Sequence, residues 1–230
     1  MSSISSSNQE RYIALPVTID EYFRSYRLDE LKKYLDITEK YLKTAEDDFK
    51  ARVDKETEIL SRENLSPGEI NDILSDEYWR YSERFPRIFR NSFLVSAISL
   101  LEHELNLICN RLKKEQNIRI NLSDLTGDTL ERTKKYFQNA GLELPFSDPS
   151  WQEINNYYMV RNCIVHNNGL IQGVKGERAL RSYISRKKII SEDTIKEEIA
   201  LTPEFCREVV ETIQVFLVEL EKSMHPESKE

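Results

Sequence analysis

The sequence predicts an all-α fold, a helical bundle with a long N-terminal helix and a small β-hairpin near the C-terminus. Only six of the 230 residues are glycine and seven are proline, so few residues break helices. Apolar residues make up 39% of the chain, enough to bury a core, and they recur mostly three and four positions apart. That spacing places apolar side chains on one face of a helix.

Residues 1–18 are expected to be disordered, and residues 19–62 to form one long amphipathic helix with Asp20 as its N-cap. Apolar or small residues repeat along this helix at alternating spacings of four and three: Leu31, Leu35, Thr38, Leu42, Ala45, Phe49 and Val53. Such a stripe can pack on the protein's own domain or against a partner helix. The sequence leaves both alternatives open.

Residues 67–222 are expected to form the bundle, and residues 223–230 a flexible tail. Ser66 can cap the first helix of this bundle, with Pro67 at the first helical position and Glu69 three residues after the cap.

The helix that follows is apolar on nearly all sides from 93 to 101, so it must lie in the middle of a bundle or in a subunit interface. Pro86 should kink this helix or divide it in two. A third helix is expected over 123–140, ending at Gly141.

Asp148 and Pro149 should begin a fourth helix that stops at residues 167–169, Asn-Asn-Gly. The secondary structure of segment 176–188 is ambiguous from its sequence. Residues 187–202 resemble two short strands around a polar turn at Ser191 to Asp193, and a last amphipathic helix begins at Pro203.

The charge and the apolar segments exclude several classes of protein. A net charge of −7 argues against a protein that coats nucleic acid, so RNA would meet only a local site. The N-terminus has no secretory pattern, and the nearly apolar run 93–101 is about half the length that spans a bilayer. We therefore expect a cytoplasmic protein without membrane contact. Cys109, Cys163 and Cys206 are too few and scattered for a disulfide framework.

The known catalytic motifs are largely missing. The pair His103-Glu104 would begin a zinc motif, but Leu107 stands where the second histidine is needed. There is no glycine-rich phosphate loop, and the pair Cys163 and His166 lacks the further groups of a thiol protease. No metal and no cofactor is expected.

The stretch YYMVRNCIVHNNG, residues 157–169, gathers residues suited to RNA cleavage at a helix end. Asn162 and His166 are four apart and share a face, and Arg161 has the reach to join them. Histidine can give or take a proton near neutral pH, and the fork of arginine matches phosphate oxygens. Because one chain supplies one such histidine, a twofold dimer would bring a second set. The alternative is structural: Arg161 pairs with a surface carboxylate, and His166 favours the helix dipole.

The chain resembles the HEPN superfamily of small helical-bundle proteins. The resemblance rests on RNCIVH, residues 161–166, and on the long apolar helix 91–112 before it. It implies a dimeric, metal-independent endoribonuclease of toxin–antitoxin or antiphage defence systems, with an antitoxin or other defence protein as a partner. Arg161 would stabilise the phosphate, Asn162 would be its polar partner, and His166 would be the acid–base residue.

Some members of the superfamily add an acidic residue on the earlier helix, where Glu102 or Glu104 stands here. The alternative is that Glu104 is a surface carboxylate and that Glu102 pairs with a nearby arginine. Members regulated by nucleotide transfer carry a tyrosine two residues after the histidine, but Asn168 stands there, so this control is not expected.

RNA contacts are expected from a basic run: Arg181, Arg186, Lys187 and Lys188. The alternative for this run is a solvated face. The alternative for the whole chain is a catalytically inactive interaction or scaffold protein that holds a partner with helix 19–62.

Overall fold

A computed structural model describes residues 19–63, 65–142, 149–187, 190–193 and 197–224. It confirms the all-α bundle with a two-stranded antiparallel hairpin near the C-terminus. The elements are, in order, α1 (Ile19–Arg62), α2 (Pro67–Trp79), the π-helical turn η1 (Arg80–Arg84), α3 (Phe85–Glu115), the 3-10 turn η2 (Leu122–Asp124), α4 (Thr129–Asn139), α5 (Pro149–Asn167), α6 (Glu177–Arg186), β1 (Ile190–Asp193), β2 (Glu198–Leu201) and α7 (Pro203–Met224).

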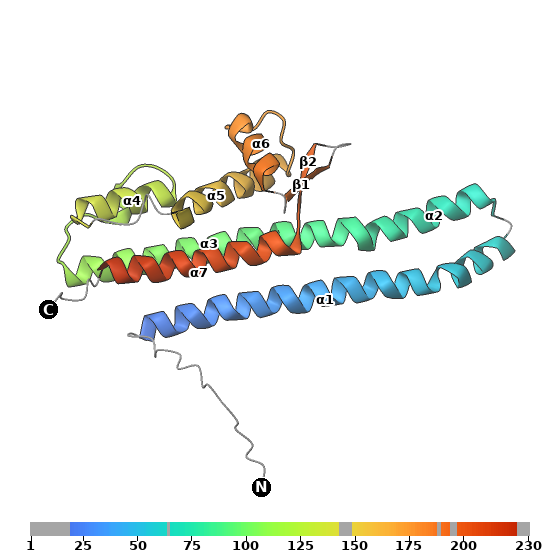
Figure 1. Ribbon diagram of the computed structural model, residues 1–230, viewed down its shortest axis with the longest axis horizontal. Helices are drawn as coiled ribbons and strands as arrows, with labels where there is room; N and C mark the ends of the chain where they lie inside the picture. The colour runs from blue at the N-terminus through green and yellow to red at the C-terminus, as the bar shows by residue number, and fades with distance from the viewer. Residues whose placement is uncertain (1–18, 64, 143–148, 188–189, 194–196, 225–230) are drawn as a thin grey trace, which may run out of the picture.

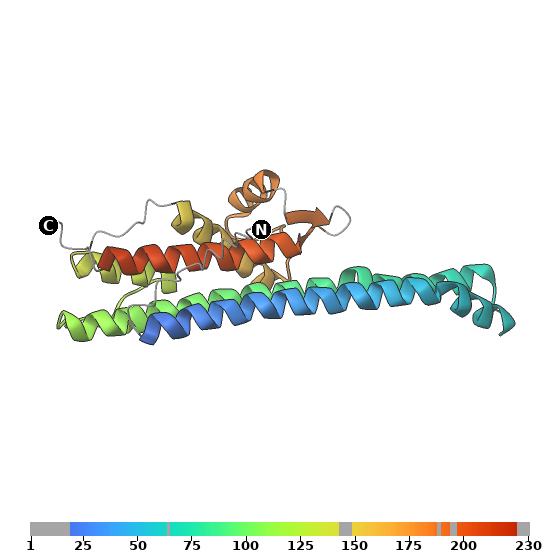
Figure 2. The same cartoon turned by 60° about the horizontal axis from the view of Figure 1, so that its bottom comes forward.

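The helices lie in three layers. Helix α1 runs antiparallel to the continuous helix formed by α2, η1 and α3, and α7 lies beside both α1 and α3 (Figure 1). Helices α4, α5 and α6 lie on the other side of α3 and α7, away from α1 (Figure 2). The end of α1 and all of α2 extend past α7 as a two-helix arm.

The apolar segment 93–101 lies in the middle of the bundle. Phe93, Leu94, Ala97 and Ile98 are fully buried, whereas Ser96 between them and Ser99 after them face solvent. The wider helix Pro67–Glu115 contains an 18-residue window with a mean hydropathy of 1.3, long and apolar enough to cross a membrane by composition. Half of this window is buried inside the bundle, as in the core helix of a soluble protein, so it is weak evidence for a membrane span.

The stripe predicted on α1 faces its own chain. Leu35 belongs to the buried core, which α3 and α7 also line, and Leu31 packs against it. Phe49, farther along the stripe, is buried against Tyr78 and Tyr81. Of the two alternatives for this stripe, packing on the protein's own domain is therefore the one observed.

Helix α3 passes Pro86 without a break. Proline has no N–H to donate, and the helix widens just before it into a π turn in which Phe85 N–H donates to the Arg80 carbonyl. The expected kink or division is thus a π turn inside one helical stretch. The capping box of Ser66 and Glu69 forms as predicted, with Pro67 in the first turn of α2.

Other boundaries differ from the prediction. Helix α4 begins at Thr129 rather than near 123, because the Asp128 side chain accepts a hydrogen bond from Glu131 N–H and caps the helix there. The polar turn expected at Ser191 to Asp193 is wrong, since these residues belong to β1, where Asp193 pairs with Glu198.

At the chain ends, α7 continues through Met224, so the expected tail cannot begin at 223. The expected disorder of residues 1–18, the cap at Asp148 and the rest of the tail, 225–230, lie outside the described residues.

A buried network of charges joins α1, α3 and α7. Glu104, only 1% exposed, accepts from Arg24 Nε at 3.1 Å and from Arg27 Nη2 at 2.6 Å. Arg24 Nη2 also lies 2.8 Å from Glu221 Oε1, as a charge–charge contact without hydrogen-bond alignment. Arg111 donates to the other Glu221 oxygen. The expectation that Glu104 is a surface or catalytic carboxylate is therefore wrong: it is a buried structural anion.

Glu104→Gln should lower the free energy of unfolding by about 3 kcal/mol, since it removes the charge that faces the buried Arg24 and the half-buried Arg27 and leaves Arg24 with Glu221 alone. A matched change on the surface, Glu219→Gln, removes a 3.1 Å ion pair with Lys222 and should cost less than about 0.5 kcal/mol. Urea unfolding followed by circular dichroism measures both. Equal effects of the two substitutions would contradict the structural role of the network.

Candidate functional site

The motif helix α5 ends where the sequence predicts. Tyr157, Val160 and Cys163 are buried against the bundle, which turns the intervening polar residues outward. Asn168 and Gly169 adopt the left-handed backbone, with φ of 52° and 82°, and Gly169 N–H donates to the Cys163 carbonyl at 3.1 Å. This is the bonding of a helix C-terminus closed by glycine. It fixes the last turn, which carries His166.

Arg161 is half-buried and is held beside Asn162. Its Nη1 donates to Asn162 Oδ1 at 3.0 Å, and its Nε–H is buried without a hydrogen-bond partner in the part of the chain that the structure describes. No described carboxylate lies within ion-pair distance of the guanidinium. The structural alternative, a surface ion pair for Arg161, is therefore not observed.

His166 lies on the outer face of the last turn of α5, and it is exposed together with Asn162. Five residues advance a helix by about 140° beyond one full turn, so Arg161 and His166 leave the helix in different directions. Asn162, four residues before His166 and bonded to Arg161, connects the two flanks. Within one chain, Arg161 and His166 therefore lie along one exposed edge of the helix end and do not converge on a common point.

Glu102 of α3 contacts α5 at Tyr158, a residue for which the sequence predicted no role. Tyr158 O–H donates to Glu102 Oε1 at 2.8 Å, from α5 to α3. Burial raises the pKa of Tyr158 well above its usual value, and the hydrogen bond and charge of Glu102 raise it further. The charge of Arg161 acts on this pKa in the opposite direction, as the smallest of these effects. Glu102 is thus adjacent to the motif, bonded to a phenol and not to an arginine.

The predicted basic run is partly neutralised by carboxylates. Arg181 donates to Glu177 at 2.9 Å and to Glu197 at 3.3 Å. Lys187 pairs with Glu208, and with Glu153 at 3.5 Å.

Arg186 is exposed, with its guanidinium 5.7 Å from the centre of the Tyr183 ring. Lys188 lies outside the described residues. Of the described members of the basic run, Arg186 is therefore the one that keeps an exposed charge without a described carboxylate partner.

The cysteines are unsuited to nucleophilic catalysis. Cys163 Sγ donates to the Leu170 carbonyl at 3.2 Å, and burial raises the pKa of Cys163 to about 11. Burial also raises the pKa values of Cys109 and Cys206 to about 12. A thiol with such a pKa carries almost no thiolate near neutral pH. Within the described ranges, no group of three metal-ligating side chains comes together.

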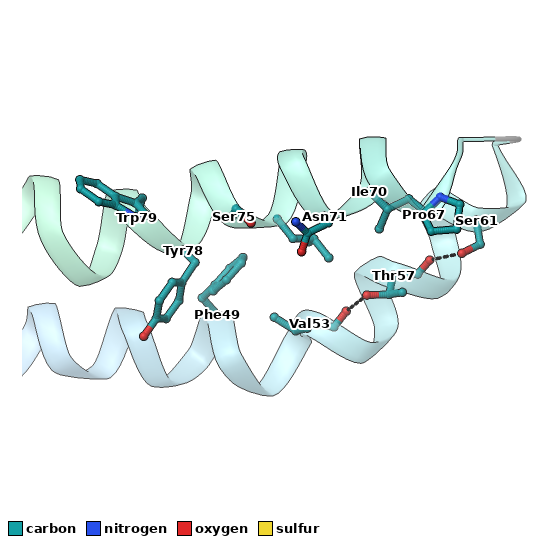
Figure 3. A pocket seen from close by; sticks show the side chains of 11 residues that line it. Phe49, Val53, Thr57, Ser61, Pro67, Ile70, Asn71, Ser75, Tyr78 and Trp79 are labelled. Carbon is teal, nitrogen blue, oxygen red and sulfur yellow. Dashed lines mark hydrogen bonds between the residues drawn. The ribbon is translucent and has the colours of Figure 1, made fainter. Parts of the chain in front are cut away.

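The sequence analysis missed a groove of about 770 Å³ in the two-helix arm. Phe49, Val53 and Thr57 of α1 line it opposite Ile70 and Tyr78 of α2 (Figure 3). Small polar side chains, among them that of Thr57, which donates to the Val53 carbonyl, do not fill the space between the helices. One feature of the sequence could have indicated this groove: the apolar stripe that begins at Leu31 ends at Val53, nine residues before α1 ends. Had α1 and α2 packed tightly along their whole length, apolar residues would have continued to the end of the helix.

Comparison with known proteins adds no assignment: no family model, no curated protein and no solved structure matches this chain. The HEPN resemblance therefore stays a prediction from RNCIVH and the helix before it.

The native protein should show no thiol reactive toward Ellman's reagent at pH 8, because all three cysteines are buried and their pKa values are raised. All three should react after denaturation, which serves as the control. Raised thiol pKa values also make the folded state bind more protons than the unfolded chain, so stability should fall as the pH rises above about 9. Rapid labelling of Cys163 in the native protein would contradict the conclusion that the cysteines are buried and unreactive.

Proposed function

We propose that this protein is a metal-independent endoribonuclease of the HEPN type, active as a dimer in toxin–antitoxin or antiphage defence. The observation that carries the proposal is the state of Arg161. Its guanidinium is half-buried, bonded to Asn162 and without a described carboxylate, on the helix end that exposes His166. A cation held in this way is available to an anion from outside the chain.

The proposed reaction uses the RNA's own 2′-OH. This oxygen attacks phosphorus while a base takes its proton, and the 5′-oxygen leaves with a proton from an acid. The products are a 2′,3′-cyclic phosphate and a 5′-OH end. His166 performs one proton transfer, and Arg161 stabilises the charge on the non-bridging oxygens. Asn162 orients the guanidinium through its 3.0 Å hydrogen bond.

A second subunit completes this arrangement. The motif of one chain offers one histidine, whereas the reaction has separate acid and base roles, and Arg161 and His166 point about 140° apart. Two exposed apolar side chains lie at this helix end, Val165 within the motif at 46% and Leu170 after it at 40% exposure. Covering them in a twofold contact would bring the second motif to the same edge.

A catalytically inactive interaction protein is the second candidate. It is favoured by the ion pairs that neutralise Arg181 and Lys187, and by the groove in the two-helix arm, which lies far from α5. On this alternative His166 is a residue that favours the C-terminal dipole of α5.

Arg161→Ala and His166→Ala should each lower the rate of RNA cleavage at least about 100-fold, the usual effect of losing a proton-transfer or phosphate-stabilising group. Arg119→Ala and His103→Ala are matched controls, because both residues are exposed and lie outside the motif. Cleavage of a labelled RNA by purified protein, with circular dichroism to check folding, measures the effect. Unchanged cleavage by both motif variants would assign the activity to a contaminant and favour the interaction protein.

A metal chelator should leave the cleavage rate unchanged, because the proposed chemistry uses side chains and the 2′-OH alone. The cleaved ends should carry a 2′,3′-cyclic phosphate, and a 2′-deoxy residue at the cleavage site should block the reaction. Strong inhibition by the chelator, reversed by added Mg²⁺, would contradict the proposed mechanism.

A further inference from the structure

Helix α1 carries a second apolar stripe, on the face that the bundle leaves open. Six large side chains, each between 50% and 72% exposed, form what is called here the outer stripe: Tyr22, Phe23, Tyr26, Tyr34, Ile37 and Tyr41. Tyr26 and Ile37 are eleven residues apart, close to three helical turns, so they lie on one line along the helix. Leu28 and Leu35, which face the core, are fully buried.

The bundle covers the other sides of α1. Lys32 and Asp36 bond to α7, at Gln214 and Arg207, and Glu39 pairs with Arg90 of α3. Of the described elements, α2, η1, α3 and α7 make the main contacts with α1. They leave each side chain of the outer stripe at least half exposed, although the Tyr34 ring meets that of Phe89 of α3 edge-on, with ring centroids 5.6 Å apart. Several large exposed apolar side chains on one face of a helix are characteristic of an interaction surface.

We propose that the outer stripe is a homodimer interface in which the α1 helices of two copies pack antiparallel. Four of the six stripe residues pair with one another about a point between Leu31 and Lys32, and the other two, Phe23 and Tyr34, fall opposite Lys40 and Asp29. With a twofold axis there, Tyr22 faces Tyr41 of the second copy, and Tyr26 faces its Ile37. A twofold interface needs such a pattern, because each position meets its mate across the axis.

The charges follow the same symmetry. Glu30 and Lys33 are exposed and pair within the chain at 2.8 Å. Across the axis, Glu30 of one copy faces Lys33 of the other, so two pairs of opposite charge flank the centre. Farther out, Phe23 faces Lys40, an arrangement that allows a cation–π contact. Parallel packing would instead place each of these charges beside its identical mate.

The area is sufficient for a specific contact. Tyr22 to Tyr41 spans about 30 Å of helix. An aromatic side chain presents about 150–250 Å², and about half of each one in the stripe is exposed, so covering the stripe buries roughly 500–600 Å² per copy. The total, about 1,100 Å², exceeds most crystal-packing contacts and lies at the small end of specific interfaces, where weak and transient associations are found.

This interface is distinct from the proposed nuclease cleft. Helices α3 and α7 separate α1 from α5, so an α1 contact leaves both Arg161 edges free (Figures 1 and 2). The inference therefore does not rest on RNA cleavage, and a dimer held by another surface would overturn it without touching the nuclease proposal. A monomeric wild-type chain would contradict both.

Sedimentation velocity of the full chain over a range of concentrations tests the interface. Tyr26→Glu should raise the dimer dissociation constant at least about tenfold, because it places a carboxylate near the centre of the contact. Val218→Glu is the matched control: Val218 is 47% exposed on α7, outside the stripe, and its change should leave the constant unaltered. Circular dichroism verifies that both variants fold.

A charge exchange tests the antiparallel register. Glu30→Lys places lysines opposite each other across the axis, and Lys33→Glu does the same with glutamates, so each variant alone should dimerise several-fold more weakly. Mixing the two variants restores opposite charges on both sides of the axis. Native mass spectrometry of the mixture should then show more heterodimer than the statistical proportion.

Three results would overturn the proposal: a wild-type chain that stays monomeric, a dimer that Tyr26→Glu does not weaken, or a statistical mixture in the charge exchange. A dimer that survives Tyr26→Glu but is lost with Val165→Glu would place self-association at the α5 edge instead. RNA cleavage measured on the same variants separates the two questions, since outer-stripe changes should leave it unaltered.

Discussion

The carboxylate of Glu104, buried where α1, α3 and α7 meet, is the constraint on which the arrangement of the bundle depends. A carboxylate at 1% exposure is costly unless counter-charges and hydrogen bonds surround it, and two arginines of α1 supply them. Glu221 of α7 holds one of these arginines from the other side. Because such contacts are directional, they hold α1 against α3 and also fix its position along the length of α3. The pair of Glu39 with Arg90, bidentate at 2.8 Å and 2.9 Å, repeats the same constraint farther along the seam.

Fixing α1 in this register also decides which of its faces is left over. The inner stripe, the row from Leu31 to Val53, packs on the bundle, and the outer stripe on another face of the same helix stays at least half exposed. On their far side, α3 and α7 support α5, so that Tyr158 meets Glu102 and the motif edge lies at the helix end. The two surfaces that carry the proposals are therefore held apart by one shared layer of helices.

Local features could be predicted from the sequence, and features that depend on distant residues could not. The cap at Ser66 and the stop after Asn167 follow from residues a few positions apart, and both form as expected. Glu104 looked like a solvent carboxylate because its partners on α1 lie 77 and 80 positions away in the sequence. The basic run looked available to RNA because Glu208, which neutralises Lys187, belongs to another helix. The outer stripe was missed because the inner stripe on the same helix has a similar spacing. The inner stripe alone was enough to explain why apolar residues recur along α1.

The same distinction applies to the candidate site. Sequence spacing correctly places Asn162 and His166 on one exposed face, since helix geometry alone determines it. What spacing cannot supply is the burial of Arg161, which withdraws its Nε–H from solvent while leaving the group without a described carboxylate. An unpaired cation at a partly buried position costs stability. A chain under selection for folding alone would gain by pairing Arg161 or by replacing it, so its unpaired state favours a role in binding an anion. That argument supports a phosphate ligand independently of the histidine, and it makes Arg161 the residue on which the nuclease proposal chiefly depends.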